Sequence, residues 1–264
     1  MKKIVSIVLA VSMLAVCVTG CKTTTRKQLK PVVLNEVAHS IFYAPQYAAI
    51  ELGYFEDEGL DLTLVNGAGA DKVMTALISG DADIGFMGSE ASIYVYQQGS
   101  DDYAVNFAQL TQRAGNFLVG REAQDNFTWA DLKGKKVLGG RAGGMPEMVF
   151  EYILKKNGID PAADLTIDQS INFGLTAAAF TSNDADYTVE FEPFATGLEK
   201  EGNGHVIASL GVDSGYVPYT AYSVKKSYLE KNPETIHKFT NAIQKGLEYV
   251  NTQDRKRTRL NSRH

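Results

Sequence analysis

The chain has 264 residues, of which 44% are hydrophobic and 22% charged, with 24 Gly against 7 Pro. This composition is typical of a globular α/β protein and excludes a disordered, collagen-like or coiled-coil chain. The formal net charge is −5, and basic residues are enriched at both ends, so the body is more acidic than this figure suggests. An acidic body argues against nucleic acid as a partner.

The N-terminus has the pattern of a secretory signal. Two lysines precede an apolar run over residues 4–19, which is short for a membrane span. The run ends in Val18-Thr19-Gly20-Cys21, which resembles the lipobox of bacterial lipoproteins, whose cysteine is acylated and begins the mature chain. An ordinary signal peptide cleaved near the same place is the alternative.

We therefore expect a signal peptide over residues 1–20, lipidation of Cys21 and a polar tether over residues 21–30. The only other cysteine is Cys17, so the mature chain would have no free thiol for a disulfide, a metal site or a nucleophile. These features predict a lipid-anchored protein at the outer face of the bacterial cell membrane.

From Pro31 onward, strand and helix patterns alternate, which predicts mostly parallel sheets covered by helices. In the first part we expect strands at 32–39, 60–65, 82–87 and 104–110 and helices at 45–52, 71–78 and 91–98. In the second part we expect strands at 136–138 and 205–210, a helix at 145–156, and a return through 219–224 to a last helix at 233–250.

An internal repeat organises this pattern. Residues 76–83 read ALISGDAD, and residues 179–186 read AFTSNDAD. Each copy ends a helix, turns and starts a short strand, which predicts two similar lobes, although short turn sequences can coincide by chance. We place the first lobe at 31–120 plus 220–253 and the second at 121–219, joined by a hinge of two crossovers near 117–121 and 219–224.

Three stretches carry a resemblance to a known family: SIFYAPQY at 40–47, ELGYF through EGLDL at 51–62, and LISGDADIG at 77–85. They resemble the solute-binding proteins of ABC importers for nitrate, sulfonates, taurine and thiamine-pyrimidine precursors, the NMT1/THI5-like family. The resemblance covers about residues 32–250. It implies a two-lobed type II periplasmic-binding-protein fold that delivers a small molecule to a permease and its ATPase; we expect a monomer.

The C-terminal residues 254–264 depart from the family, whose members usually continue with further helices. This segment is basic, with no apolar helical stripe. We expect it to be foreign or out-of-frame sequence that replaces the natural end. A native tail that binds anionic lipid is the alternative.

No catalytic or metal-binding pattern is present in the sequence. The four histidines are scattered, and the glycine-rich turn at 139–144 fits neither the dinucleotide nor the P-loop fingerprint. We expect no cofactor. We expect this turn to expose N–H groups of the following helix to a ligand.

The candidate ligand residues follow the carboxyl ends of strands, where α/β proteins bind ligands. They are His39, Ser40, Tyr43, Gly69, Ser89 and Glu90 on the first lobe and Arg141, Gly144, Met145 and Glu192 on the second. Each has a structural alternative: His39 could be a buried imidazole, Tyr43 a core aromatic, and the two glutamates could complement helix dipoles. Arg113 is a weaker candidate, and Arg141 is less favoured than the others, because most arginines lie at the solvated surface.

Paired carboxylates and aromatic rings suit a flat ligand that donates hydrogen bonds, such as an aminopyrimidine. Nitrate, sulfonates and taurine's sulfonate need donors instead, and remain the alternative if Glu90 caps its helix or pairs with Arg141. A second class of function is an enzyme related to the pyrimidine synthases of the same family. The signal sequence argues against it, and so does the absence of a free cysteine in the mature chain, because those synthases use a cluster of cysteines. A sensor or adhesin without transport is a third.

The lipobox makes the first testable prediction. Changing Cys21→Ala should release the protein from membranes into the periplasm or medium, because the acylation point is lost. Membrane fractionation with detergent partitioning measures this. A variant that stays membrane-bound with unchanged partitioning would show that the anchor is assigned wrongly.

Overall fold

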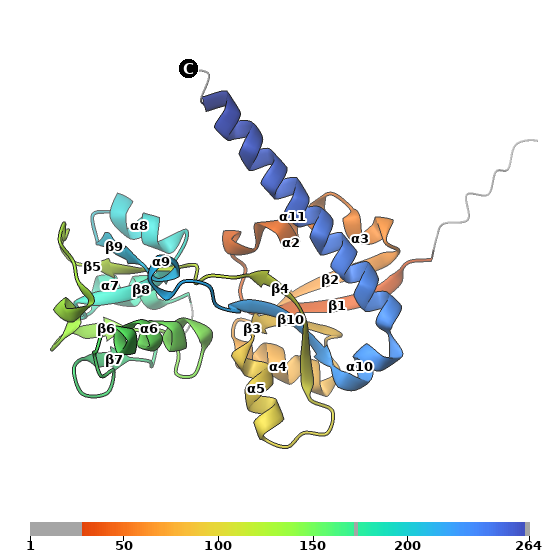
Figure 1. Ribbon diagram of the computed structural model, residues 1–264, viewed down its shortest axis with the longest axis horizontal. Coiled ribbons are helices and arrows are strands. Elements are labelled where there is room, and N and C mark those ends of the chain that lie inside the picture. Colours follow the sequence, from red (N-terminus) through yellow and green to blue (C-terminus); the bar gives the residue numbers. More distant parts are fainter. Residues whose placement is uncertain (1–27, 172–173, 262–264) are drawn as a thin grey trace, which may run out of the picture.

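Two lobes lie side by side in the computed structural model, and each is built on a five-stranded sheet flanked by helices (Figure 1). The structure describes residues 28–171 and 174–261, with side chains as far as Gln253. The expected signal peptide, Cys21 and most of the tether lie outside the described residues. The predicted two-lobed α/β class is confirmed.

The first lobe has the strand order β2-β1-β3-β10-β4, in which β10 runs antiparallel to both neighbours and the first three strands are parallel. Its strands are β1 (Lys30–Glu36), β2 (Leu60–Asn66), β3 (Ile84–Gly88), β4 (Ala104–Thr111) and β10 (Thr220–Lys225). Its helices are η1 (Ile41–Tyr43), α2 (Ala44–Glu51), α3 (Tyr54–Asp57), α4 (Ala70–Ser79), α5 (Glu90–Gln97), α10 (Lys226–Lys231) and α11 (Pro233–Asn261). The elements predicted as far as residue 111 are present, with bounds displaced by a few residues.

The second lobe has the order β7-β6-β8-β5-β9, in which β5 is the antiparallel strand. Its strands are β5 (Asn116–Gly120), β6 (Lys136–Leu138), β7 (Thr166–Asp168), β8 (Tyr187–Phe191) and β9 (His205–Ser209). Its helices are η2 (Trp129–Leu132), α6 (Met145–Lys156), α7 (Thr176–Ser182), α8 (Phe194–Lys200) and α9 (Leu210–Ser214). The two sheets therefore have equivalent strand orders.

Local sequence explains how the helices of the first lobe begin and end. Pro45 lies in the first turn of α2, where a missing N–H leaves no helical bond unmade. Gly80 ends α4 in the left-handed conformation, with φ of 89°, which a side chain would disfavour. Between these ends, α4 buries Val73, Met74 and Leu77 on one face.

Asp83 and Asp186 show that the sequence repeat is structural. Asp83 Oδ2 accepts a hydrogen bond from Val33 N at 2.9 Å, and Asp83 N donates to Val33 O at 3.0 Å. Asp186 makes the same two bonds with Lys136, both at 2.9 Å. Val33 and Lys136 are separated by the same number of residues as the two aspartates. One copy of the repeat thus fastens β3 to β1, and the other fastens β8 to β6, the first of the parallel strands in its lobe.

The chain crosses between the lobes earlier than the sequence suggested. We expected the first lobe to reach residue 120, but β5 belongs to the second sheet, where Leu118 and Val119 are fully buried. Its apolar run makes it a central strand instead of a linker. The crossings are the short segments 112–115 and 215–219, which are joined by hydrogen bonds from Val217 N to Gln112 O (3.0 Å) and from Tyr219 N to Thr111 O (3.2 Å).

The last helix, α11, packs across the first lobe (Figure 1). Phe239 contacts Phe55 with ring centroids 5.2 Å apart, and a Cβ on Gly246 would lie only 2.2 Å from Pro45 O, so α11 and α2 approach closely. The predicted end at Val250 is wrong, because the helix continues to Asn261. No Gly or Pro follows Gly246, and Arg, Lys and Gln favour helix.

The equivalent aspartates make the second prediction. Asp83→Ala and Asp186→Ala should each lower the free energy of unfolding by about 1–2 kcal/mol, because each removes a charge-assisted bond and leaves a strand N–H unpaired. Asp81→Ala is the matched control, since its carboxylate meets only the neighbouring Ser79 hydroxyl at 2.8 Å. Urea unfolding measures all three. Equal effects for Asp81 and Asp83 would contradict the structural role of the repeat.

Candidate functional site between the lobes

A cavity of about 740 Å³ lies between the two lobes. The first lobe contributes the loop after β1 and the first turns of α4 and α5, and the second contributes the turn before α6 and the end of β8. All but one of the expected ligand residues line it: His39, Ser40, Tyr43, Gly69, Glu90, Arg141, Gly144, Met145 and Glu192. Apolar side chains such as Met74, Ile78, Phe191 and Phe194 make up much of the remaining wall.

Ser89 is the exception. It is buried, and its hydroxyl donates to Pro218 O at 2.5 Å, so it fastens the second crossing segment to the start of α5 and does not line the cavity. Arg113 also lies at the crossings, where its guanidinium donates to Gly211 O at 2.9 Å and stacks over the Tyr216 ring. Both expected candidates therefore support the connection between the lobes.

Glu36 holds the loop that carries His39 and Ser40. Its carboxylate is 1% exposed, accepts hydrogen bonds from Gln46 Nε2 (2.8 Å) and the Tyr47 hydroxyl (2.9 Å), and lies 3.0 Å from His39 Nδ1. The His39 side chain is 68% exposed, so the alternative of a buried imidazole is wrong. Sequence reasoning missed Glu36, although an acidic residue that ends an apolar strand was a usable signal.

Two buried tyrosines form part of the cavity wall. Tyr43 packs edge-on against Phe86, with ring centroids 4.6 Å apart. Tyr219 is 3% exposed, and its hydroxyl has no hydrogen-bond partner among the described residues. Burial raises the pKa of both hydroxyls, so both remain neutral groups that can donate or accept.

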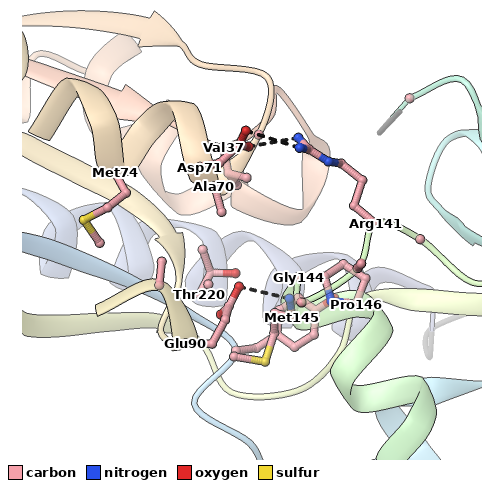
Figure 2. A pocket seen from close by; sticks show the side chains of 18 of the residues that line it. Val37, Ala70, Asp71, Met74, Glu90, Arg141, Gly144, Met145, Pro146 and Thr220 are labelled. Atoms are coloured by element: carbon pink, nitrogen blue, oxygen red, sulfur yellow. Dashed lines mark hydrogen bonds and ion pairs between the residues drawn. The ribbon is translucent and has the colours of Figure 1, made fainter. Parts of the chain in front are cut away.

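Glu90 reaches across the cleft from the start of α5. Its side chain is 3% exposed, and Oε1 accepts a hydrogen bond from Met145 N at 3.0 Å, in the first turn of α6 (Figure 2). Its other oxygen, Oε2, has no partner in the described parts of the chain. Burial raises the pKa of this carboxyl to about 7. Glu90 therefore neither points away from the cleft nor pairs with Arg141, the two alternatives that the sequence left open.

Arg141 pairs instead with Asp71 on the opposite lobe, through Nη1–Oδ1 at 2.9 Å and Nη2–Oδ2 at 3.2 Å (Figure 2). Gly69 leaves room for this pair, since a Cβ there would lie 2.7 Å from Asp71 Oδ1 and 2.9 Å from Arg141 Nη1. The Tyr94 hydroxyl adds a third contact between the lobes by donating to Gly143 O at 3.1 Å. Together these bonds join the two lobes across the cavity.

Glu190 is a second buried carboxylate of the cavity, and sequence reasoning did not choose it. It is 2% exposed and accepts from the hydroxyls of Thr188 (2.6 Å) and Thr176 (3.0 Å); burial raises its pKa to about 7. Glu192 also lines the cavity, but its two oxygens accept from Thr196 N (3.1 Å) and the Thr196 hydroxyl (2.8 Å). The Glu192 carboxylate is therefore engaged within the first turn of α8.

Within residues 28–171 and 174–261, no group of three or more His, Cys, Asp or Glu side chains is placed to hold a metal ion. No helix of the same range is long and apolar enough to cross a bilayer.

The sequence and the fold of this chain are similar to those of known proteins. YtlA of Bacillus subtilis (strain 168) is 49% identical over 90% of this chain and 70% of its own length. The 4-amino-5-hydroxymethyl-2-methylpyrimidine phosphate synthase THI11 of Saccharomyces cerevisiae is 26% identical over 79% of this chain and 63% of its own length. The chain thus spans less than two thirds of the yeast enzyme.

The fold has a solved counterpart in the periplasmic aliphatic sulphonate binding protein SsuA of Escherichia coli. The two superpose with a TM-score of 0.69 over 86% of this chain and 76% of SsuA, at 18% sequence identity, which is a likeness of fold alone. The family model described as NMT1/THI5 like matches residues 41–255, which include the second lobe, the first lobe after β1 as far as residue 255, and every cavity residue from Tyr43 to Thr220. The chain therefore belongs to the NMT1/THI5-like family, within the two-lobed fold of periplasmic binding proteins.

Proposed function

We propose that this protein is the extracytoplasmic solute-binding component of an ABC importer, tethered to the membrane by lipid on Cys21. It captures a small molecule between its lobes and delivers it to a permease and its ATPase. The observation that carries the proposal is the cavity of about 740 Å³, whose wall comes from both lobes. Only a few side chains bond across it, and the two lobes are otherwise joined by two short crossing segments that can serve as a hinge. Such a site binds by closing around its ligand.

The charge of the cavity wall favours a ligand that donates hydrogen bonds. Among the described residues that line it, Arg141 is the single Lys or Arg side chain, and both of its terminal nitrogens are engaged by Asp71. Glu90 and Glu190 are buried without a cationic partner. A ligand with N–H groups would complement these carboxylates, whereas an anion would meet them without compensation.

The aromatic side chains of the cavity wall favour a ligand with a flat ring. Tyr43, Phe191 and Tyr219 offer flat faces and edges, and the unpartnered Tyr219 hydroxyl can bond a ring nitrogen or an amino group. We therefore favour an aminopyrimidine-like solute over nitrate, taurine or another sulfonate. The proposal is of a binding protein and not an enzyme; the yeast synthase is the more distant of the two relatives compared above.

Calorimetry tests the ligand class. A 4-aminopyrimidine series should bind the purified protein, because its amino and ring groups match the buried carboxylates, and methanesulfonate, taurine and nitrate should give no binding heat. The panel is read at one pH and one salt concentration. Tight binding of an anion in the absence of any aminopyrimidine binding would exclude this ligand class.

Solution scattering tests capture by closure. Saturating ligand should shift the population toward closed molecules and lower the radius of gyration, and it should raise the melting temperature because the ligand binds the folded, closed state. Arg141→Ala removes one interlobe bond and should enlarge the ligand-dependent change, since more molecules are open beforehand. An unchanged radius of gyration in both proteins at saturation would indicate a rigid pocket.

A further inference from the structure

The start of α6 is an anion-binding element that the protein has filled with its own carboxylate. The turn at 139–144, which lines the cavity from Gly140 to Gly144, leads directly into this helix. Met145 N is one of the donors at the helix start, and Pro146, the next residue, has no N–H to offer. The acceptor on Met145 N is Glu90 Oε1 from the opposite lobe, at 3.0 Å, and not a group of the same helix (Figure 2).

The backbone beside Glu90 is shaped to keep the carboxylate there. A Cβ on Gly88 would lie 2.1 Å from Glu90 Oε2 and 2.5 Å from Oε1, so only glycine leaves room for this position. The side chain is 3% exposed, and Oε2 has no partner among the described residues. An acidic group so deeply buried with one oxygen unsatisfied is costly, which argues for a role beyond packing.

A second acidic side chain occupies the same helix end. Glu147 is 4% exposed; its Oε2 accepts from Gly143 N at 3.2 Å and its Oε1 from Gln169 Nε2 at 2.9 Å. Two of the donors at this end of α6 are therefore engaged by carboxylates. Arg141, which follows the same strand, is held by Asp71 and does not compensate them.

We propose that Glu90 is the specificity-determining residue of the cleft: it occupies the α6 N-terminus in the place of an anionic ligand group and so excludes anions from the site. The inference rests on the proposed function, because it supposes that a solute binds in this cavity. It also explains how one fold can bind anions in some proteins and hydrogen-bond donors in others. A helix start left free accepts an anion, and the same helix start covered by a carboxylate admits a ligand that donates.

The test is a gain of binding. Glu90→Ala should free Met145 N and remove the acidic group that covers it. Methanesulfonate and nitrate, which should give no binding heat with the wild type, should therefore bind this variant measurably, at least about tenfold more tightly than the detection limit set by the wild type. Adding Glu147→Gln should tighten binding further, since a second acidic group is removed from the same helix end. Glu192→Ala is the matched control: it deletes an acidic group of the same cavity that does not touch α6, so any gain in anion binding should be much smaller than in the Glu90 variant.

Calorimetry with sodium methanesulfonate and sodium nitrate measures each variant, and Glu90→Ser replaces Glu90→Ala if the alanine variant does not give a cooperative thermal transition. Folded Glu90 variants without a gain, a gain in the Glu192 control of equal size, or wild-type protein that already binds methanesulfonate tightly would each overturn the inference. The proposed ligand class fails separately, if the aminopyrimidines do not bind the wild-type protein. That result does not depend on how the variants bind anions.

Discussion

The bond between Glu90 of one lobe and the Met145 N–H of the other determines the character of the cleft. It places a buried acidic side chain on the helix start that faces the cavity, and it links the two lobes. Its existence depends on the absence of a side chain at Gly88 and on the turn that aims α6 at the cavity. The helix dipole and the N–H group offset part of the cost of burying this carboxyl group, although burial still raises its pKa to about 7.

The repeated architecture brings these groups together. Each lobe fastens its third parallel strand to its first through an aspartate, Asp83 or Asp186, and the strand ends of both lobes open toward the shared cavity. The two crossing segments are short and hydrogen-bonded to each other, so the lobes are linked at one place, which the proposed function uses as the hinge. Across the cavity the lobes meet through a few side-chain contacts, among them the exposed Arg141–Asp71 pair.

Much of this arrangement could be predicted from the sequence because it depends on local pattern. Strand and helix alternation predicted the two sheets, and the repeat of Asp83 and Asp186 predicted their similarity. Nine of the ten ligand residues that the strand-end rule selected line the cavity. Partners in space could not be predicted. Nothing near Arg141 in the sequence indicated Asp71. Glu190 was not among the expected ligand residues, because its burial depends on the fold around Thr176 and Thr188.

Native mass spectrometry of the protein purified from cells that produce it naturally tests the central claim most directly, because a closed cleft retains its ligand through gentle purification. The account predicts a bound small molecule whose mass and fragmentation identify a nitrogen heterocycle bearing an amino group. It also predicts that the adduct is lost when Glu90 is replaced. A retained sulfonate or nitrate in the wild-type protein would contradict the account.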